Sequence, residues 1–208
     1  MKDQQVESKK VWDSAVRLFH WSLVVAFVVA YITGEEEGVI HSYTGYFILG
    51  LIVFRIIWGF VGCKYARFSA FIYSPRETIS YAKSMVSGTP KHYWGHNPLG
   101  ALMVFALLIT LSLTTISGLK VYGIEGYGPL AELDSSYFIS NANASGGMEQ
   151  DKDESDEEEF WEEIHEFFAN LMLVLIALHI IGVFVSSRVH NENLVKSMLT
   201  GYKSYRKK

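Results

Sequence analysis

The chain has 208 residues, of which 50% are hydrophobic and 19% are charged, and its mean hydropathy is +0.16. Charges are sparse for a soluble protein, and nothing in the sequence indicates a separate soluble domain. The formal net charge is −4, and we expect no nucleic-acid partner. The single cysteine, Cys63, excludes an intramolecular disulfide.

Four long apolar runs occupy residues 12–32, 43–61, 99–119 and 167–185. Each approaches or reaches the roughly 20 residues that a helix needs to span the hydrocarbon core of a bilayer. We therefore predict an all-α integral membrane protein, a four-transmembrane-helix bundle that forms a single domain over residues 11–205. The first run lacks a small-residue cleavage site, so we interpret it as a retained anchor and not as a signal peptide.

The connections between the runs carry start and stop signals. The first helix is expected to end near Thr33-Gly34, and His41 lies at the entry of the second. In the loop 64–97, Ser74-Pro75 predicts the start of a short amphipathic helix on the membrane surface, which ends before Gly88. Proline after Asn97 opens the third spanning helix, where its missing N–H costs least.

The third connection contains a polar and acidic stretch, residues 141–159. Its acids repel one another and bury no apolar surface, so we predict a disordered periplasmic loop insertion. We interpret it as a solvated tether, with the alternative that it attracts a basic soluble partner.

Charge is distributed unevenly among the connections. The N-terminal arm, the segment 62–96 and the tail after Ser187 are basic, whereas the other two connections are acidic. Because basic flanks stay in the cytoplasm, both termini are predicted to be cytoplasmic. The protein is then a multi-pass protein of the bacterial inner membrane.

His165, just before the last apolar run, and His179, within it, are fourteen residues apart. Fourteen residues are close to four helical turns, so both rings leave one face of the helix about 21 Å apart along its axis. Such a pair suits two haem irons, because neutral imidazole is a haem axial ligand. With one cysteine, neither a CxxCH attachment site nor a cysteine-ligated iron–sulfur cluster is possible, so any haem is non-covalent and b-type.

The depth of each histidine predicts the pairing. The first helix runs outward, which puts His20 toward the inner side, and the second begins outside at His41. The fourth helix also begins outside, so His165 is outer and His179 inner. We predict two bis-histidine haems b, ligated by His41 with His165 and by His20 with His179. A histidine near the interface can also be structural, whereas His179 lies within an apolar helix and is functional by default.

Other residues near these positions could serve the same cofactors. A buried arginine needs an anion, so Arg55, Arg17 and Arg67 are candidates for haem propionates, with lipid phosphate as the alternative for the last two. We expect His92 and His190 to be surface histidines, and we leave open a role for His96 with quinone or protons. Glycines near the ligands can serve haem or close helix packing; they are Gly45, Gly50, Gly100, Gly118 and Gly182.

Several segments together resemble the prokaryotic cytochrome b561 family, which is similar to the b-type cytochrome subunits of nickel–iron hydrogenases. They are Val11-Trp12-Asp13, Arg17-Leu-Phe-His20-Trp21, His41-Ser-Tyr-Thr-Gly45, Phe54-Arg55 to Gly62, Tyr65-Ala-Arg67-Phe68, Gly95-His96-Asn97-Pro98-Leu-Gly100, Ile164-His165-Glu166, His179-Ile-Ile-Gly182 and His190-Asn-Glu-Asn-Leu-Val195. The resemblance implies a four-helix cytochrome with two b haems at His20, His41, His165 and His179. It does not extend to the acidic stretch.

The hypothesis for function is electron transfer, without a catalytic residue, in a respiratory chain. The protein would relay electrons between the quinone pool and a periplasmic redox partner such as a c-type cytochrome. One alternative is the membrane anchor of a hydrogenase or dehydrogenase complex. An alternative of another class is a haem-free proton or metal transporter that uses the intramembrane histidines. Membrane lipid surrounds the protein in each case.

Overall fold

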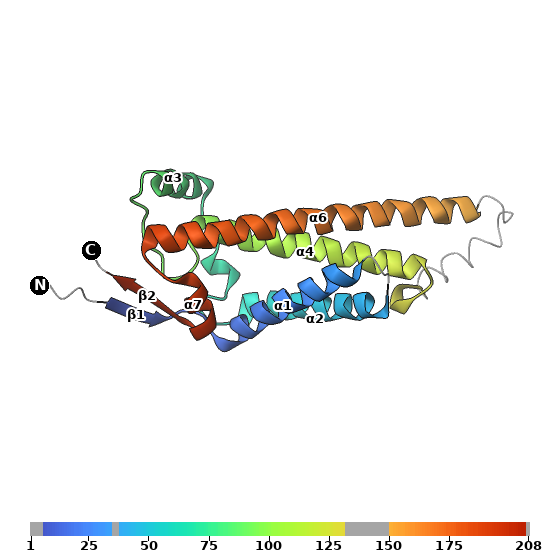
Figure 1. Cartoon of the computed structure of the whole chain (residues 1–208), viewed down its shortest axis with the longest axis horizontal. Coiled ribbons are helices and arrows are strands. Elements are labelled where there is room, and N and C mark those ends of the chain that lie inside the picture. The colour runs from blue at the N-terminus through green and yellow to red at the C-terminus, as the bar shows by residue number, and fades with distance from the viewer. Residues whose placement is uncertain (1–5, 35–37, 132–149, 207–208) are drawn as a thin grey trace, which may run out of the picture. The chain divides into compact units, whose positions relative to one another are not determined.

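The computed structural model describes residues 6–34, 38–131 and 150–206. Four long helices dominate: α1 (Ser14–Thr33), α2 (Val39–Val61), α4 (Pro98–Ile124) and α6 (Gln150–His190), as Figure 1 shows. They coincide with the four predicted spans, and α1 ends at the predicted Thr33. The chain is an all-α integral membrane protein.

The four helices expose their apolar side chains. Each is long and apolar enough to cross a membrane, yet at most 22% of the most hydrophobic window of each is buried within the chain. Val25, Phe47, Ile57 and Phe184 are among the large side chains left exposed. A helix that is apolar on all sides and little buried by its own chain has lipid as its natural surroundings.

The loop after α2 contains the predicted short helix. This helix, α3 (Pro75–Val86), has Ser74 as its N-cap, and the Ser74 hydroxyl accepts a hydrogen bond from the backbone N–H of Glu77. A 3₁₀ turn, η2 (Phe68–Ala70), precedes it. The cap before α4 also has a side-chain acceptor, since Asn97 Oδ1 receives the backbone N–H of Gly100 at 2.8 Å. Both helix starts read from the sequence are confirmed.

The two ends of the chain are joined in a way that hydropathy does not predict. Strand β1 (Val6–Lys10) pairs antiparallel with β2 (Tyr202–Arg206), which follows the short helix α7 (Leu194–Thr200). The backbone N–H of Val11 then donates to the carbonyl of Gly201 at 2.9 Å. The termini therefore lie on the same side of the membrane, as an even number of spans requires.

The chain divides into two compact units. Unit 1 consists of the described residues of Met1–Val25, Gly50–Leu108 and Val174–Lys208, and unit 2 of those of Ala26–Leu49 and Ile109–Leu173. Each unit contains a part of all four long helices. Trp12, Ile52 and Phe71 are buried in unit 1, whereas Ile48 and Met172 are buried in unit 2.

The acidic stretch differs from the prediction of disorder. Residues 141–149 lie outside the described residues, but α6 begins at Gln150, so residues 150–159 are helical. The reason is that extending an existing helix adds one hydrogen bond for each residue that is fixed, and this segment continues directly into the span. Glutamate, which occupies positions 157–159, is also a good helix former.

The exposed thiol of Cys63, two residues after α2, tests the predicted orientation. If the termini are cytoplasmic, a membrane-impermeant maleimide will label Cys63 in inside-out vesicles and not in intact spheroplasts. The control is the double variant Cys63→Ser, Glu159→Cys, in which the thiol lies at the other end of the spans and the labelling is reversed. Labelling of Cys63 in intact spheroplasts would contradict the predicted orientation.

Candidate functional site

Unit 2 brings His41 of α2 and His165 of α6 together. Their ring centroids are 6.1 Å apart, and the rings are nearly perpendicular, at 86°. Metal–imidazole bonds are about 2 Å long, so two rings that ligate one metal from opposite sides have centroids about 6 Å apart. The observed separation therefore fits one metal ion between the two rings.

The hydrogen bonds of these two rings to backbone carbonyls involve Nδ1, so Nε2 of each ring can bind a metal. The Nδ1 atom of His41 lies 2.9 Å from the carbonyl oxygen of Ala30, and that of His165 lies 2.8 Å from the carbonyl oxygen of Thr114. A carbonyl can only accept, so each Nδ1 carries the proton, and Nε2 of each ring keeps its lone pair. These hydrogen bonds to backbone carbonyls fix the tautomer that a metal-binding histidine needs.

Gly118 of α4 lies directly against the His165 ring. A Cβ atom at position 118 would be 2.8 Å from Cε1 and 3.0 Å from Nδ1 of that ring. The neighbouring Ser117 is buried, and its hydroxyl lies 3.3 Å from the same Nδ1 atom. Helix α4 thus holds His165 in place by close approach, and of the five glycines noted in the sequence Gly118 has a clear role here.

Unit 1 contains the other predicted pair, His20 of α1 and His179 of α6. The two side chains are close enough to interact electrostatically. In contrast to the histidines of unit 2, His20 has a buried Nδ1 atom with no partner among the described residues. The ring of His20 packs edge-on against that of Trp21, with centroids 5.1 Å apart.

The three predicted arginines all belong to unit 1, but their surroundings differ. Arg55 is 5% exposed, its guanidinium lies over the rings of Phe68 and Phe71, and its Nη1 is buried without a hydrogen-bond partner among the residues that the structure describes. Arg17 donates to the carbonyl of Leu199, while its Nε is buried and has no hydrogen-bond partner in the described part of the chain. Arg67 instead uses its Nε on the carbonyl of Gly62, at 2.8 Å. Arg55 therefore has the strongest need for an anion.

His96, whose role the sequence left open, also lies in unit 1. Its ring packs between Trp12 and Phe71, at centroid distances of 4.7 and 4.6 Å, and its Nδ1 is buried and finds no hydrogen-bond partner within residues 6–34, 38–131 and 150–206. Burial, followed by the charges of Arg55 and Lys203, lowers the pKa of His96 to about 3. The ring is thus neutral near pH 7 and has one nitrogen free for a ligand.

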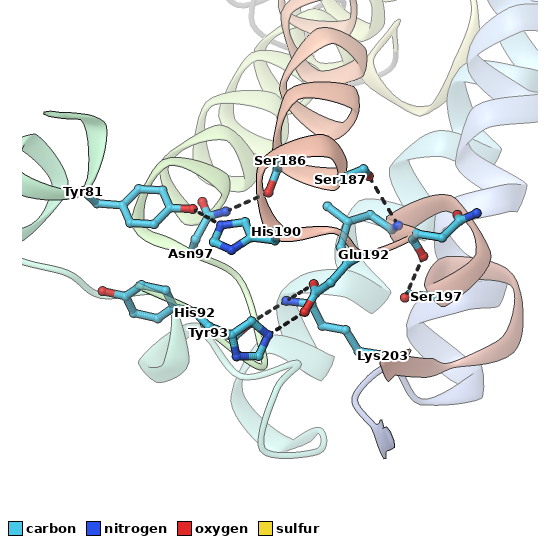
Figure 2. A network of polar contacts seen from close by, with 12 residues as sticks. Tyr81, His92, Tyr93, Asn97, Ser186, Ser187, His190, Glu192, Ser197 and Lys203 are labelled. Carbon is cyan, nitrogen blue, oxygen red and sulfur yellow. Dashed lines mark hydrogen bonds and ion pairs between the residues drawn. The ribbon is translucent and has the colours of Figure 1, made fainter. Parts of the chain in front are cut away.

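His92 and His190, which we expected to be surface histidines, are half-buried, and each has a specific polar partner. The Nε2 atom of His92 lies 2.5 Å from a carboxylate oxygen of Glu192, whose side chain is 1% exposed, and Lys203 pairs with the other oxygen at 3.1 Å (Figure 2). The Nε2 atom of His190 forms a hydrogen bond with the hydroxyl of Tyr81, at 2.9 Å. These partners are distant in sequence and no local pattern signals them.

The charges in this group depend on one another. Burial alone would raise the pKa of Glu192, but the hydrogen bond with His92 and the positive charge of Lys203 outweigh it, so the pKa is lowered. Burial lowers the pKa of Lys203, against the opposing effect of Glu192. Burial also raises the pKa of Tyr81 to about 12, so this side chain stays a neutral hydroxyl. Glu192 is therefore an ionised carboxylate inside the protein.

Comparison with known proteins identifies the family. The family model of the prokaryotic cytochrome b561 matches residues 11–201. The chain belongs to the prokaryotic cytochrome b561 family. It is a membrane cytochrome of the b type, a carrier of electrons that uses haem b, and the resemblance noted in the sequence is confirmed.

Relatives with curated descriptions cover almost the whole of this cytochrome. The probable Ni/Fe-hydrogenase B-type cytochrome subunit of Cupriavidus necator is 22% identical, over 98% of this chain and 90% of its own. The probable Ni/Fe-hydrogenase 1 B-type cytochrome subunit of Escherichia coli K12 is 24% identical, over 99% and 94%. The corresponding subunit of Rhodobacter capsulatus is 23% identical, over 94% and 81%. No solved structure matches the chain.

Proposed function

We propose that this cytochrome holds two haems b, one in each unit, and passes electrons between them across the membrane. His41 and His165 ligate the haem of unit 2, and His20 and His179 ligate that of unit 1. The observation that carries the proposal is the pair in unit 2, with ring centroids 6.1 Å apart and each Nδ1 on a backbone carbonyl. Two imidazole ligands leave no iron position open, which suits electron transfer better than oxygen chemistry.

The arginines bind the haem carboxylates in this proposal. Arg55 has a buried nitrogen without a partner in unit 1, where His20 and His179 also lie, so it holds a propionate of that haem. Arg17 and Arg67 are further candidates, and Arg17 is the better supported of the two because its Nε is also buried and unpartnered. A carboxylate would satisfy these donors at little cost, since charge-assisted hydrogen bonds are strong.

Each of the two haems would exchange electrons with a different partner. We infer exchange with the quinone pool on the cytoplasmic side, where unit 1 supplies polar side chains, and with a periplasmic redox protein on the other side. A c-type cytochrome is one such partner. The names of the relatives described above favour a second candidate, a hydrogenase, for which this cytochrome would be the membrane anchor. The haem-free transporter considered from the sequence is set aside, because the family is one of b-type cytochromes.

Removing one ligand of each pair tests the haem count and the pairing. Purified wild-type protein should contain two haems b per chain by pyridine haemochrome assay. His179→Ala and His41→Ala should each lose one haem, and reduced-minus-oxidised spectra should show that the two variants lose different ones. One haem in the wild type, or loss of the same spectral component in both variants, would contradict the proposal.

Substitution of Gly118 tests the geometry of unit 2. In Gly118→Ala the added Cβ would collide with the His165 ring at 2.8 Å, so the ring must shift away from its carbonyl partner. We expect the low-spin electron paramagnetic resonance signal of the haem of unit 2 to shift or to disappear, while the signal of the other haem stays unchanged. Gly50→Ala is the matched control, because Gly50 is exposed and a Cβ there meets nothing within 4 Å. Identical spectra for Gly118→Ala and the wild type would argue against His165 as a ligand.

A further inference from the structure

We propose that buried and half-buried polar residues of unit 1 form a proton pathway, which connects an open polar cavity beside α3 with the surroundings of His96. The pathway consists of Tyr81, His190, His92, Glu192 and Lys203. This inference rests on the proposed exchange with quinone. Reduction of a quinone to a quinol takes up two electrons and two protons, and oxidation of the quinol releases both. An electron carrier alone does not move the protons, so side chains must do so.

The cavity provides the entrance. It has a volume of about 450 Å³ and is lined by hydroxyl-bearing and charged side chains, among them Tyr81, Tyr93 and Glu77. Tyr81 belongs both to this lining and to the interior, because it is 4% exposed and its hydroxyl contacts Nε2 of His190 at 2.9 Å. A hydroxyl both donates and accepts, so Tyr81 can pass a proton to His190 while it takes one from the cavity, without ionising.

The middle of the pathway is formed by three titratable side chains, those of His190, His92 and Glu192. The rings of His190 and His92 have centroids 6.1 Å apart, a gap that one bridging water can close. His92 then shares its Nε2 with a carboxylate oxygen of Glu192 at 2.5 Å, and Glu192 meets Lys203 at 3.1 Å (Figure 2). An imidazole–carboxylate pair exchanges a proton within a single hydrogen bond. Glu192 is the residue that links the histidine to the lysine.

The pathway ends at His96, which we propose exchanges a proton with a quinone oxygen. Lys203 and His179 both interact electrostatically with His96, whose buried Nδ1 has no hydrogen-bond partner in the part of the chain that the structure describes. His96 therefore lies near the proposed haem ligand His179 and has a nitrogen available to a quinone oxygen. A neutral imidazole relays a proton by accepting at one nitrogen and donating from the other.

A purely structural role for the group is the competing explanation. The ion pair of Glu192 and Lys203 ties the start of β2 to the loop after α6, and Lys203 also donates to the carbonyl of Tyr93. If the ion pair only holds these segments together, its loss would affect folding and haem binding. It would not make the rate of haem reduction by quinol depend on proton delivery. An apolar pair of similar size would also hold these segments together without burying charge.

The test is the rate at which a short-chain ubiquinol reduces the haems of the full-length protein in lipid nanodiscs. Glu192→Gln keeps the shape of the side chain but cannot accept a proton, and we expect it to slow the reaction about tenfold or more. Tyr81→Phe removes only the hydroxyl beside the cavity and should also slow it. Lys196→Gln, at an exposed position of α7, is the control and should react at the wild-type rate. Acetate, a small proton carrier, should restore part of the rate in the slowed variants.

The outcomes separate this inference from the proposed function. Haem content, midpoint potentials and the rate of reduction by dithionite should be unchanged in both slowed variants. Wild-type rates in Glu192→Gln and Tyr81→Phe would overturn the pathway, as would slow variants with altered haem spectra and no response to acetate. If Glu192→Gln does not fold, Tyr81→Phe alone decides. A wild-type protein that does not react with ubiquinol would refute the proposed function itself.

Discussion

A polar side chain within a membrane must find its hydrogen-bond partners inside the protein, because lipid offers none. This constraint explains the most informative contacts of the structure. His41 and His165 satisfy their Nδ1 atoms with backbone carbonyls of neighbouring helices, so each ring is held in one tautomer and one orientation. Because Nδ1 carries the proton in both rings, the lone pair of each ring lies on Nε2, the nitrogen that a metal would bind.

The two units meet the same constraint differently. In unit 2 the protein itself holds the rings of its histidine pair, with Gly118 allowing α4 to approach. Unit 1 contains buried nitrogens on His20, Arg55 and His96 that have no hydrogen-bond partner among its described residues. Such atoms cost free energy unless a ligand satisfies them. Unit 1 therefore has the larger need for bound groups, and a propionate and a quinone are the two that we propose.

Much of the fold could be predicted from the sequence because its signals are local. The four spans follow from hydropathy alone, and the starts of α3 and α4 follow from Ser74 and Asn97, whose caps depend on residues three positions away. The helical extension of α6 over residues 150–159 was missed, since charge repulsion suggested disorder while the span beside it nucleates the helix.

What could not be predicted depends on contacts between distant residues. The pairing of β1 with β2 joins residues almost 200 positions apart, and a five-residue polar strand has no clear pattern. The surroundings of His92 were misjudged for the same reason, because its partner Glu192 lies 100 residues away. Likewise, the sequence suggested several glycines near the ligands but could not single out Gly118.

The central claim is that each unit holds one haem iron between its two histidines. The most direct measurement is a crystal structure of the purified protein with data collected at the iron absorption edge. We predict two anomalous peaks per chain, one between the imidazoles of His41 and His165 and one between those of His20 and His179. A single peak, or a peak bound by any other pair of side chains, would contradict the account.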